Sequence, residues 1–437
     1  MIDMQSSIQE CIEQVIQQNP VIKNIFEEIH KQGGKVLLVG GAVRDCLLQK
    51  FGSDLDFEVY HMTFEQLEQI LQKFGKVSFV GKSFGVLRLH DIDADWSIPR
   101  IDNQGRKPTV NLDPDMSYEQ AFKRRDVTVN AMGINVHTRN LVDPYQGVDD
   151  LRNEILRSPD INFFVQDPLR LFRLMQFVAR LHMTPNDELN EVCKTMDIST
   201  ISSERIDSEF KKLFLKSVQP SRGLRWLQKI DRFSELFVGL KPLESLFISI
   251  DCLAAKKVTD EQKLSAMWGL IAYHIVDVEF KSDMVFAQFK GVQEISNNIV
   301  KEQSKIKDFL KRFLHKSDMI QHATMIAWYV RYIPVLTQQQ DIVPYKWLAY
   351  WVAQTMNLEM LSIVGYCLFE PNMMEDFIMN AGQAGVLQEA EEPLLQGKDL
   401  LDQAEGKELG ALLKKAYAIQ LNQGVHDKEQ LMRLVIK

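Results

Sequence analysis

The sequence predicts an α+β protein, with a small mixed β-sheet and helices in its N-terminal part and helices alone in the rest. Two observations lead to this fold class. Short apolar runs such as Val36–Val39 alternate with turn signals up to about residue 157, which is typical of strands in a sheet. From about Phe163 onward, the pattern changes to helices almost without interruption, and strand runs largely disappear.

The elements of the N-terminal part can be placed in chain order. Residues 1–30 have apolar side chains at helical spacing and are predicted to be helical. The strand at 36–39 runs into Gly40–Gly41, and a short amphipathic helix follows over 42–48. Residues 101–115 contain Gly, Pro, Asp and Asn and few apolar side chains, so they are predicted to form a mobile loop. The other predicted elements are a helix over 63–74, a strand pair over 77–80 and 84–89, and a strand over 95–100.

A pair of carboxylates begins the second strand. Asp54 and Asp56 are two residues apart, so in a strand both side chains project from the same face, while Leu55 and Phe57 face the core. Two carboxylates held in this way can bind Mg²⁺, which takes oxygen ligands and shares its shell with substrate phosphates. The Gly40–Gly41 pair lets a phosphate chain approach the backbone at a helix N-terminus. A phosphate cradle beside a metal-binding pair is the minimum apparatus for nucleotidyl transfer.

Composition excludes several classes of protein. Apolar residues make up 45% and charged residues 25%, which are ordinary globular values. The five cysteines are scattered without a CxxC pair, which predicts a reducing compartment without a disulfide framework or zinc knuckle. No signal peptide is visible, and the longest apolar runs are too short to span a bilayer. These observations predict a soluble cytoplasmic protein that does not enter the membrane.

The net charge of −8 hides a strong asymmetry along the chain. Residues 205–232 hold eight Lys or Arg against three Asp or Glu, and residues 301–316 hold six against two. Residues 370–405 hold one against nine, so the acidic sign of the whole comes from this stretch. The two basic segments are available for phosphates of a nucleic acid, although each could equally be a solvated helix face.

The joint order of these signals resembles the nucleotidyltransferase head of the class II (bacterial-type) CCA-adding enzyme and poly(A) polymerase family. Six residues carry the resemblance: Gly40, Gly41, Arg44, Asp45, Asp54 and Asp56. It implies a DNA polymerase beta-like head, with Mg²⁺ held by Asp54 and Asp56. It also points to Asp95 as a third catalytic carboxylate, although Asp91 and Asp93 compete for that role.

Further segments match the family's nucleotide-handling motifs. Arg124-Arg125-Asp126, followed by Asn130, matches the RRD motif that handles the ribose and phosphates of the incoming nucleotide. Asp167 and Arg170, followed by Arg173, resemble the EDxxR element, in which an acid and an arginine read the base edge. Gln166 replaces the usual first acid of that element, and an N-cap role for Asp167 is the structural alternative. Lys82, in GKSFGVLRL, would line the nucleotide site or simply form a hairpin turn.

The resemblance implies a tRNA nucleotidyltransferase that adds CMP, CMP and AMP, taken from CTP and ATP, to the tRNA 3′ end. An A-adding enzyme or a poly(A) polymerase is the alternative within the family, and an RNA-binding protein with a silent catalytic site is the remote one. No obligate protein partner is visible. RNA contacts are expected at Lys211, Lys212, Lys216, Lys398 and Lys414.

Four domains are expected: a catalytic head over 1–157, a helical neck with the base-recognition helix over 158–236, a helical body over 237–345 and a helical tail for tRNA over 346–437. Some relatives carry a metal-dependent phosphohydrolase domain after the neck. The histidines of the predicted body lack aspartates at the helical spacing that such a metal cluster needs, so no second catalytic centre is expected.

Overall fold

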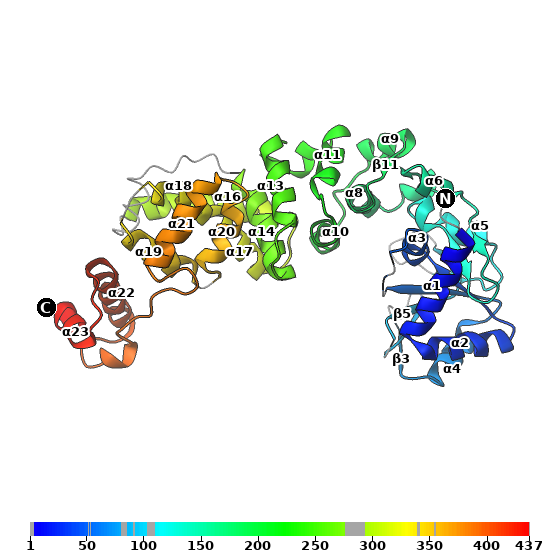
Figure 1. The fold of residues 1–437 in the computed structure, drawn as a ribbon, viewed down its shortest axis with the longest axis horizontal. Helices are drawn as coiled ribbons and strands as arrows, with labels where there is room; N and C mark the ends of the chain where they lie inside the picture. Colours follow the sequence, from blue (N-terminus) through cyan, green and yellow to red (C-terminus); the bar gives the residue numbers. More distant parts are fainter. Residues whose placement is uncertain are drawn as a thin grey trace. The chain divides into compact units, whose positions relative to one another are not determined.

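Two compact units make up the chain (Figure 1). The computed structural model describes residues 4–50, 52, 54–79, 85–90, 92–102, 110–275, 293–338, 341–353 and 355–436. The head unit is Met1–Leu174 with His182–Ile198, and the helical unit is Met175–Leu181 with Ser199–Lys437. Helix α8 (Leu169–Leu181) contributes residues to both units. The four domain boundaries expected from the sequence stay predictions.

A seven-stranded mixed sheet forms the framework of the head unit, with strand order β3-β4-β5-β2-β1-β8-β9. All neighbouring strands are antiparallel except β2 and β5, which run parallel. The α+β fold class predicted from the sequence is confirmed, and the strand of Asp95 pairs with the strand of Asp56. The strands are β1 (Lys35–Val39), β2 (Leu55–Tyr60), β3 (Val77–Phe79), β4 (Val86–Leu89), β5 (Ala94–Ser97), β8 (Gly133–Asn135) and β9 (Leu141–Val142).

Both faces of this sheet are covered, because successive residues of a strand point to opposite faces. Val36 and Leu38 join a core that includes apolar residues of α1, α2 and α4, whereas Leu37 and Val39 join a second core with Phe122 of α5. The helical segments of the head unit are α1 (Met4–Gln18), α2 (Pro20–Lys31), α3 (Gly41–Leu47), α4 (Phe64–Gln72), α5 (Tyr118–Lys123), η1 (Thr128–Asn130), α6 (Gly147–Arg152), α7 (Ile161–Phe164) and α9 (Asp187–Thr195). A further strand pair joins β10 (Ile155–Leu156) to β11 (Thr184–Pro185).

The segment predicted to be a mobile loop differs from the prediction at its ends. β6 (Arg100–Asp102) and β7 (Val110–Leu112) pair antiparallel, with Ile101 opposite Asn111. Backbone hydrogen bonds between the two arms order this part of the segment, although it holds few residues that could be buried. The tip over residues 103–109 lies outside the described residues, so its mobility stays a prediction.

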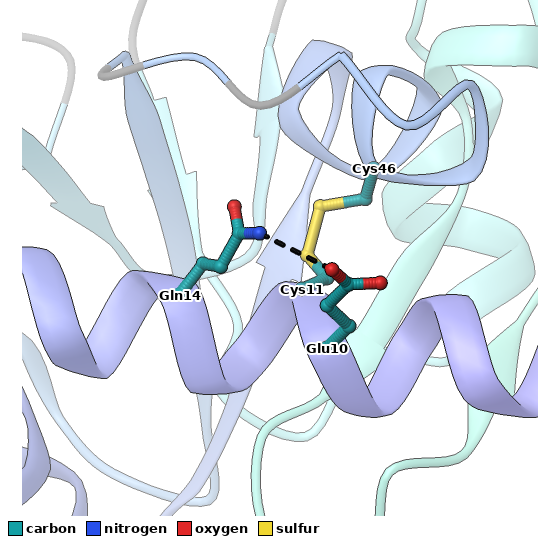
Figure 2. The surroundings of a disulfide bond; sticks show 4 residues. All are labelled: Glu10, Cys11, Gln14 and Cys46. Carbon is teal, nitrogen blue, oxygen red and sulfur yellow. Dashed lines mark hydrogen bonds between the residues drawn. A yellow bond between two sulfur atoms is a disulfide. The ribbon is translucent and has the colours of Figure 1, made fainter.

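A disulfide joins Cys11 of α1 to Cys46 of α3 (Figure 2), which differs from the expectation that the scattered cysteines form no disulfide framework. The two helices pack against each other and bring the two Cα atoms to 5.6 Å. A spacing of 35 residues contains no signal for this pairing, because the pairing depends on which helices become neighbours on the sheet. On the same helix, Gln14 Nε2 donates to Glu10 Oε1 at 3.5 Å (Figure 2).

The helical unit is organised around aromatic packing. Trp268 of α14 lies between Phe210 and Phe313, with ring centroids 5.0 Å away in each case, and all three side chains are buried. Gly269 allows α14 to approach α17, because a Cβ at this position would lie 2.5 Å from Ile326 Cγ2. Among its described residues this unit contains helices and no strand, as predicted.

The helical segments of this unit are α10 (Ser203–Lys216), α11 (Ser221–Lys229), α12 (Phe233–Leu236), α13 (Glu244–Ala254), α14 (Asp260–Tyr273), α16 (Gln293–Leu310), α17 (Ser317–Tyr329), η2 (Val330–Tyr332), α18 (Ile333–Leu336), α19 (Val343–Val352), α20 (Leu358–Gly365), α21 (Pro371–Gln383), η3 (Gly397–Asp399), α22 (Gly406–Gln423) and α23 (Lys428–Ile436). In the part of the chain that the structure describes, none of the helices combines the length and apolar character needed to cross a membrane.

Candidate active site

Three aspartates gather where β2 and β5 lie side by side. The Cα of Asp56 pairs with that of Asp95 across the two parallel strands, and Asp54 precedes β2 by one residue. Part of the Asp56 side chain meets solvent, yet burial is the largest influence on this group and raises its pKa. Arg125 opposes that rise, whereas the charges of Asp54 and Asp95 add to it. The like charges around Asp56 therefore create a place where a cation would be stabilised.

Asp95 is held by a neighbour that the sequence did not single out. Arg88 of β4 lies directly opposite Asp95, and its Nε donates to Asp95 Oδ1 at 2.6 Å. This ion pair fixes the carboxylate at the edge of the aspartate group and supplies a positive charge there.

Gly40 lets an arginine approach the aspartates. Its φ of +77° belongs to the left-handed region that favours glycine, and it is the N-cap residue of α3. A Cβ on Gly40 would lie 2.8 Å from Arg125 Nη1 and 3.6 Å from Asp56 Oδ2. Arg125 Nε has no hydrogen-bond partner among the described residues. The glycine thus brings together a backbone turn, an arginine with donor capacity to spare and a carboxylate.

A polar network behind the glycine turn links four of the predicted residues. The buried Arg44 donates from Nε and Nη2 to the carboxylate of Asp45, at 2.8 and 2.9 Å, and from Nη1 to Asn130 Oδ1. Asn130 Nδ2 donates to Asp126 Oδ1 at 3.2 Å. Arg44, Asp45, Asn130 and Asp126 are therefore joined through side chains, although they come from α3, η1 and the loop after α5.

The same network reaches α8 through Asp126. Arg173 Nε donates to Asp126 Oδ2 at 2.6 Å, and the aspartate is almost completely buried. Burial works to raise the pKa of Asp126, but the charge and hydrogen bond of Arg173 outweigh it and hold that pKa below its ordinary value. Asp126 is therefore a charged, fixed anchor between the loop after α5 and the first turns of α8.

Arg124 and Arg170 form a second connection to α8. Arg124 Nη2 donates at 3.0 Å to Oε1 of Glu58, a fully buried side chain of β2. Arg170 Nη2 donates to the carbonyl oxygen of Arg124 at 2.7 Å, and its Nη1 donates to that of Phe163 at 2.6 Å. Asp167 Oδ1 accepts from the backbone N–H of Leu169, the first residue of α8, at 3.2 Å, and Pro168 is the N-cap residue. The base-reading roles of Asp167 and Arg170 stay predictions.

The remaining predicted residues lie apart from these networks. Lys82, like Asp91, falls outside the described residues. Lys211 and Lys212 of α10 pair with the buried carboxylates of Asp207 and Glu209, at 2.7 and 2.8 Å, whereas Lys216 is exposed. In the same unit, Lys398 of η3 and Lys414 of α22 are also exposed.

Sequence reasoning missed Glu58, Tyr60 and Arg88. Glu58 and Tyr60 continue the alternation that begins at Asp54 and Asp56, so the face they occupy was available from the pattern. That pattern carries no sign of burial, and nothing in the sequence indicates that β4 would pair with β5 in the register that aligns Arg88 with Asp95.

The carboxylates of Asp54 and Asp56 are candidate ligands for a metal ion. Within the described residues, no group of three histidine, cysteine, aspartate or glutamate side chains could hold a metal ion by itself. Mg²⁺ usually keeps several waters and needs one or two carboxylates together with substrate phosphates. The oxygen donors and the crowding of like charge at Asp54 and Asp56 fit such an ion.

Comparison with known proteins identifies relatives of this chain by sequence and by structure. Residues 36–157 match the family model of the poly A polymerase head domain. A multifunctional CCA protein of Stenotrophomonas maltophilia (strain R551-3) is 34% identical over 222 residues, or 48% of this chain and 52% of the relative. One of Xylella fastidiosa (strain 9a5c) is 32% identical over 222 residues, or 48% of this chain and 51% of the relative. The chain thus spans about half the length of the curated relatives it matches.

Solved structures resemble the chain over nearly its whole length. The Bacillus stearothermophilus CCA-adding enzyme in complex with CTP has a TM-score of 0.66 and 19% identity, covering 94% of this chain and 95% of that one. The Thermotoga maritima CCA-adding enzyme complexed with tRNA-CCA has a TM-score of 0.63 and 18% identity, covering 98% of both chains. At these identities the likeness establishes the fold, which is the one predicted from the sequence.

Proposed function

Because residues 36–157 match the family model of the poly A polymerase head domain, we propose that this chain is a template-independent CCA-adding tRNA nucleotidyltransferase. It transfers CMP, CMP and AMP from CTP and ATP to the tRNA 3′ end and releases pyrophosphate. The observation that supports this most directly is the approach of Arg125 and Asp56 to the Gly40 backbone, because a triphosphate and its metal need these groups together. The relatives named multifunctional CCA protein support the choice of reaction.

In this proposal, Asp54 and Asp56 hold Mg²⁺, with Asp95 as the third carboxylate. When bound, the ion would lower the pKa of the attacking 3′ hydroxyl and neutralise charge on the departing pyrophosphate. The side chains have separate tasks around it. Arg88 keeps the Asp95 carboxylate in place, and Asp54 and Asp56 present oxygen atoms from one face of β2.

Three groups bind the incoming nucleotide in this proposal. Gly40 and Gly41 let the guanidinium groups of Arg125 and Arg44 come close to the backbone where the phosphates would bind, and Arg125 grips phosphate oxygens. Asp126 and Arg124 lie close behind. The ion pair of Asp126 with Arg173 ties the first turns of α8 to this loop, and the pair of Arg124 with Glu58 ties the loop to β2. Arg170 and Asp167 then read the base edge from the start of α8.

The RNA is bound through the exposed lysines of the helical unit. This assignment is supported by the charge asymmetry of the sequence and by the exposure of Lys216, Lys398 and Lys414. Phosphate contacts of this kind fix the position of a nucleic acid without reading its sequence.

The test is to incubate the protein with tRNA that lacks its three terminal nucleotides, with Mg²⁺, and with CTP or ATP separately and together. The expected product with both nucleotides ends in CCA, and sequencing of the 3′ ends identifies it. The head-domain match also favours poly(A) polymerase as a second candidate. Long adenosine tails on an RNA without tRNA structure would establish that reaction instead. Addition of A alone to tRNA that already ends in CC would indicate an A-adding enzyme.

A further inference from the structure

Glu58 is a charged side chain in the centre of the head unit, and none of the roles proposed above uses it directly. Its side chain is completely buried. It shares the face of β2 that carries Asp56, two residues earlier, and Tyr60, two residues later. Burying a carboxylate is costly unless it is paired and hydrogen-bonded. Such a residue is therefore expected to have a specific task.

Two partners satisfy the Glu58 carboxylate. Arg124 Nη2 donates to Oε1 at 3.0 Å, and the Tyr60 hydroxyl donates to Oε2 at 3.1 Å. Tyr60 is itself buried against Phe122 and Met116, in the core on this side of the sheet. The position of Glu58 is thus fixed from both sides, by a strand neighbour and by an arginine.

Arg124 connects Glu58 to α8 through its own backbone carbonyl group. It is the C-cap residue of α5, and its guanidinium group is directed toward β2 by Glu58. Its carbonyl oxygen accepts from Arg170 Nη2 at 2.7 Å. The orientation of the Arg170 guanidinium therefore depends on where residue 124 sits, and residue 124 is tied to the strand that carries the aspartates.

We propose that Glu58 is a positioning residue for nucleotide choice, because through Arg124 it holds Arg170 in the orientation that reads the base. This inference rests on the proposed function. If Glu58 had a merely structural role, its substitution would lower the stability and would lower the rate equally for all four nucleotides. Side chains of a binding site must be held within about 0.5 Å of their productive positions, so a shift of Arg170 caused through Arg124 is expected to change nucleotide selectivity.

The test compares Glu58→Gln, Tyr60→Phe and Arg124→Met with wild type. For each, kcat/KM for addition of CMP, AMP, UMP and GMP to shortened tRNA gives two ratios, CTP to UTP and ATP to GTP. Glu58→Gln keeps the shape and removes the charge, and it is expected to lower both ratios about tenfold, a size common for directly coupled residues. Tyr60→Phe removes only one hydrogen bond and should lower them less. Glu58→Gln added to Arg124→Met should have no further effect on the ratios.

The matched control is Asp150→Asn, which breaks a buried carboxylate pair of the same unit, with Arg157 at 2.9 Å. It should lower the melting temperature and leave both ratios unchanged. The proposal is overturned if Glu58→Gln leaves the ratios unchanged, or if Asp150→Asn lowers them equally. If Glu58→Gln does not fold, Tyr60→Phe decides the matter by the same ratios. If wild type adds no nucleotide at all, the proposed function fails, and equilibrium binding of the four triphosphates then tests Glu58 separately.

Discussion

The site of the head unit and the centre of the helical unit are stabilised by different kinds of contact. In the head unit, buried charges are paired across elements, as in Asp126 with Arg173 and Glu58 with Arg124. In the helical unit, the centre is aromatic, with Phe210, Trp268 and Phe313 in mutual contact. Buried ion pairs require a particular partner and geometry, whereas apolar packing tolerates other side chains of similar volume. Substitutions in the head unit are therefore expected to affect chemistry, and those in the helical unit to affect stability and RNA binding.

The largest expected effect is on the rate of nucleotide addition, and it distinguishes the role of the head unit from that of the helical unit. Asp54→Ala or Asp56→Ala is expected to lower the rate of nucleotide addition by roughly three orders of magnitude or more, because a catalytic metal contributes several kcal/mol to transition-state stabilisation. The affinity for tRNA should stay within a few-fold of wild type, since RNA binding is assigned to the helical unit. Single-turnover kinetics and filter binding measure the two quantities. Asp149→Ala, at an exposed position of α6, is the control. Substantial turnover by both variants would disprove the metal assignment.

The disulfide provides the next comparison. Reducing Cys11–Cys46 should lower the free energy of unfolding of the head unit by about 3–4 kcal/mol, from the chain-entropy relation for a closed loop of this length. The helical unit contains two neighbouring cysteines, Cys252 and Cys367, which are free thiols. A reductant should therefore destabilise one unit only. Chemical denaturation with and without reductant measures this, and the Cys11→Ser, Cys46→Ser double variant should be insensitive to reductant. A loss of stability in the helical unit would contradict the comparison.

Acid should weaken the helical unit more than the head unit, where burial also lowers the pKa of the more exposed His137. Burial, with a contribution from Arg331, lowers the pKa of His274 in the helical unit to about 4, from 6.5 in the unfolded chain. Its neutral form therefore contributes stability that is complete above about pH 6.5 and is lost as the pH falls toward 4. The total loss amounts to up to about 3 kcal/mol. Asp126 of the head unit has a lowered pKa, so its contribution is present above its unfolded pKa of 3.8 and is lost only below that value.

Unfolding monitored between pH 7 and pH 4 should therefore show the helical unit weakening first. His274→Gln should remove most of this acid sensitivity, while Asn130→Ala in the head unit should not. An unchanged pH dependence in His274→Gln would show that other groups cause the loss.

Sequence reasoning predicted the parts of the site that depend on local periodicity. The i, i+2 spacing of Asp54 and Asp56 predicted a common face, which stays a prediction for Asp54 because β2 begins at Leu55. The apolar runs located β1, β2 and β5. It could not predict the partners, because those depend on which elements meet in three dimensions. Arg88 faces Asp95 only through the register of β4 on β5, and Cys11 meets Cys46 only because α1 packs on α3.

In the helical unit the same limit applies more strongly. Helical periodicity predicted helices over this region, and the structure contains them. The pattern marks Phe210, Trp268 and Phe313 as apolar, but it does not indicate that residues so far apart in sequence share one aromatic cluster. The sequence pattern also overestimates the positive charge that is available to RNA phosphates, because Lys211 and Lys212 are each paired with a buried acid.

The smallest expected effect concerns these lysines of α10. The sequence predicts that neutralising Lys211, Lys212 and Lys216 together weakens tRNA binding and flattens its salt dependence. The structure assigns most of that effect to Lys216, because Asp207 and Glu209 already compensate the other two charges. Lys216→Gln should therefore reduce the slope of log K against log salt by about 0.7–0.9, the value for one phosphate contact. Adding Lys211→Gln and Lys212→Gln should change the slope little but lower stability, since two buried carboxylates lose their partners. Binding measured between 50 and 200 mM salt tests this, with Lys23→Gln of the head unit as the exposed control. A slope reduced three times as much in the triple variant would mean that Lys211 and Lys212 leave their acids to bind RNA.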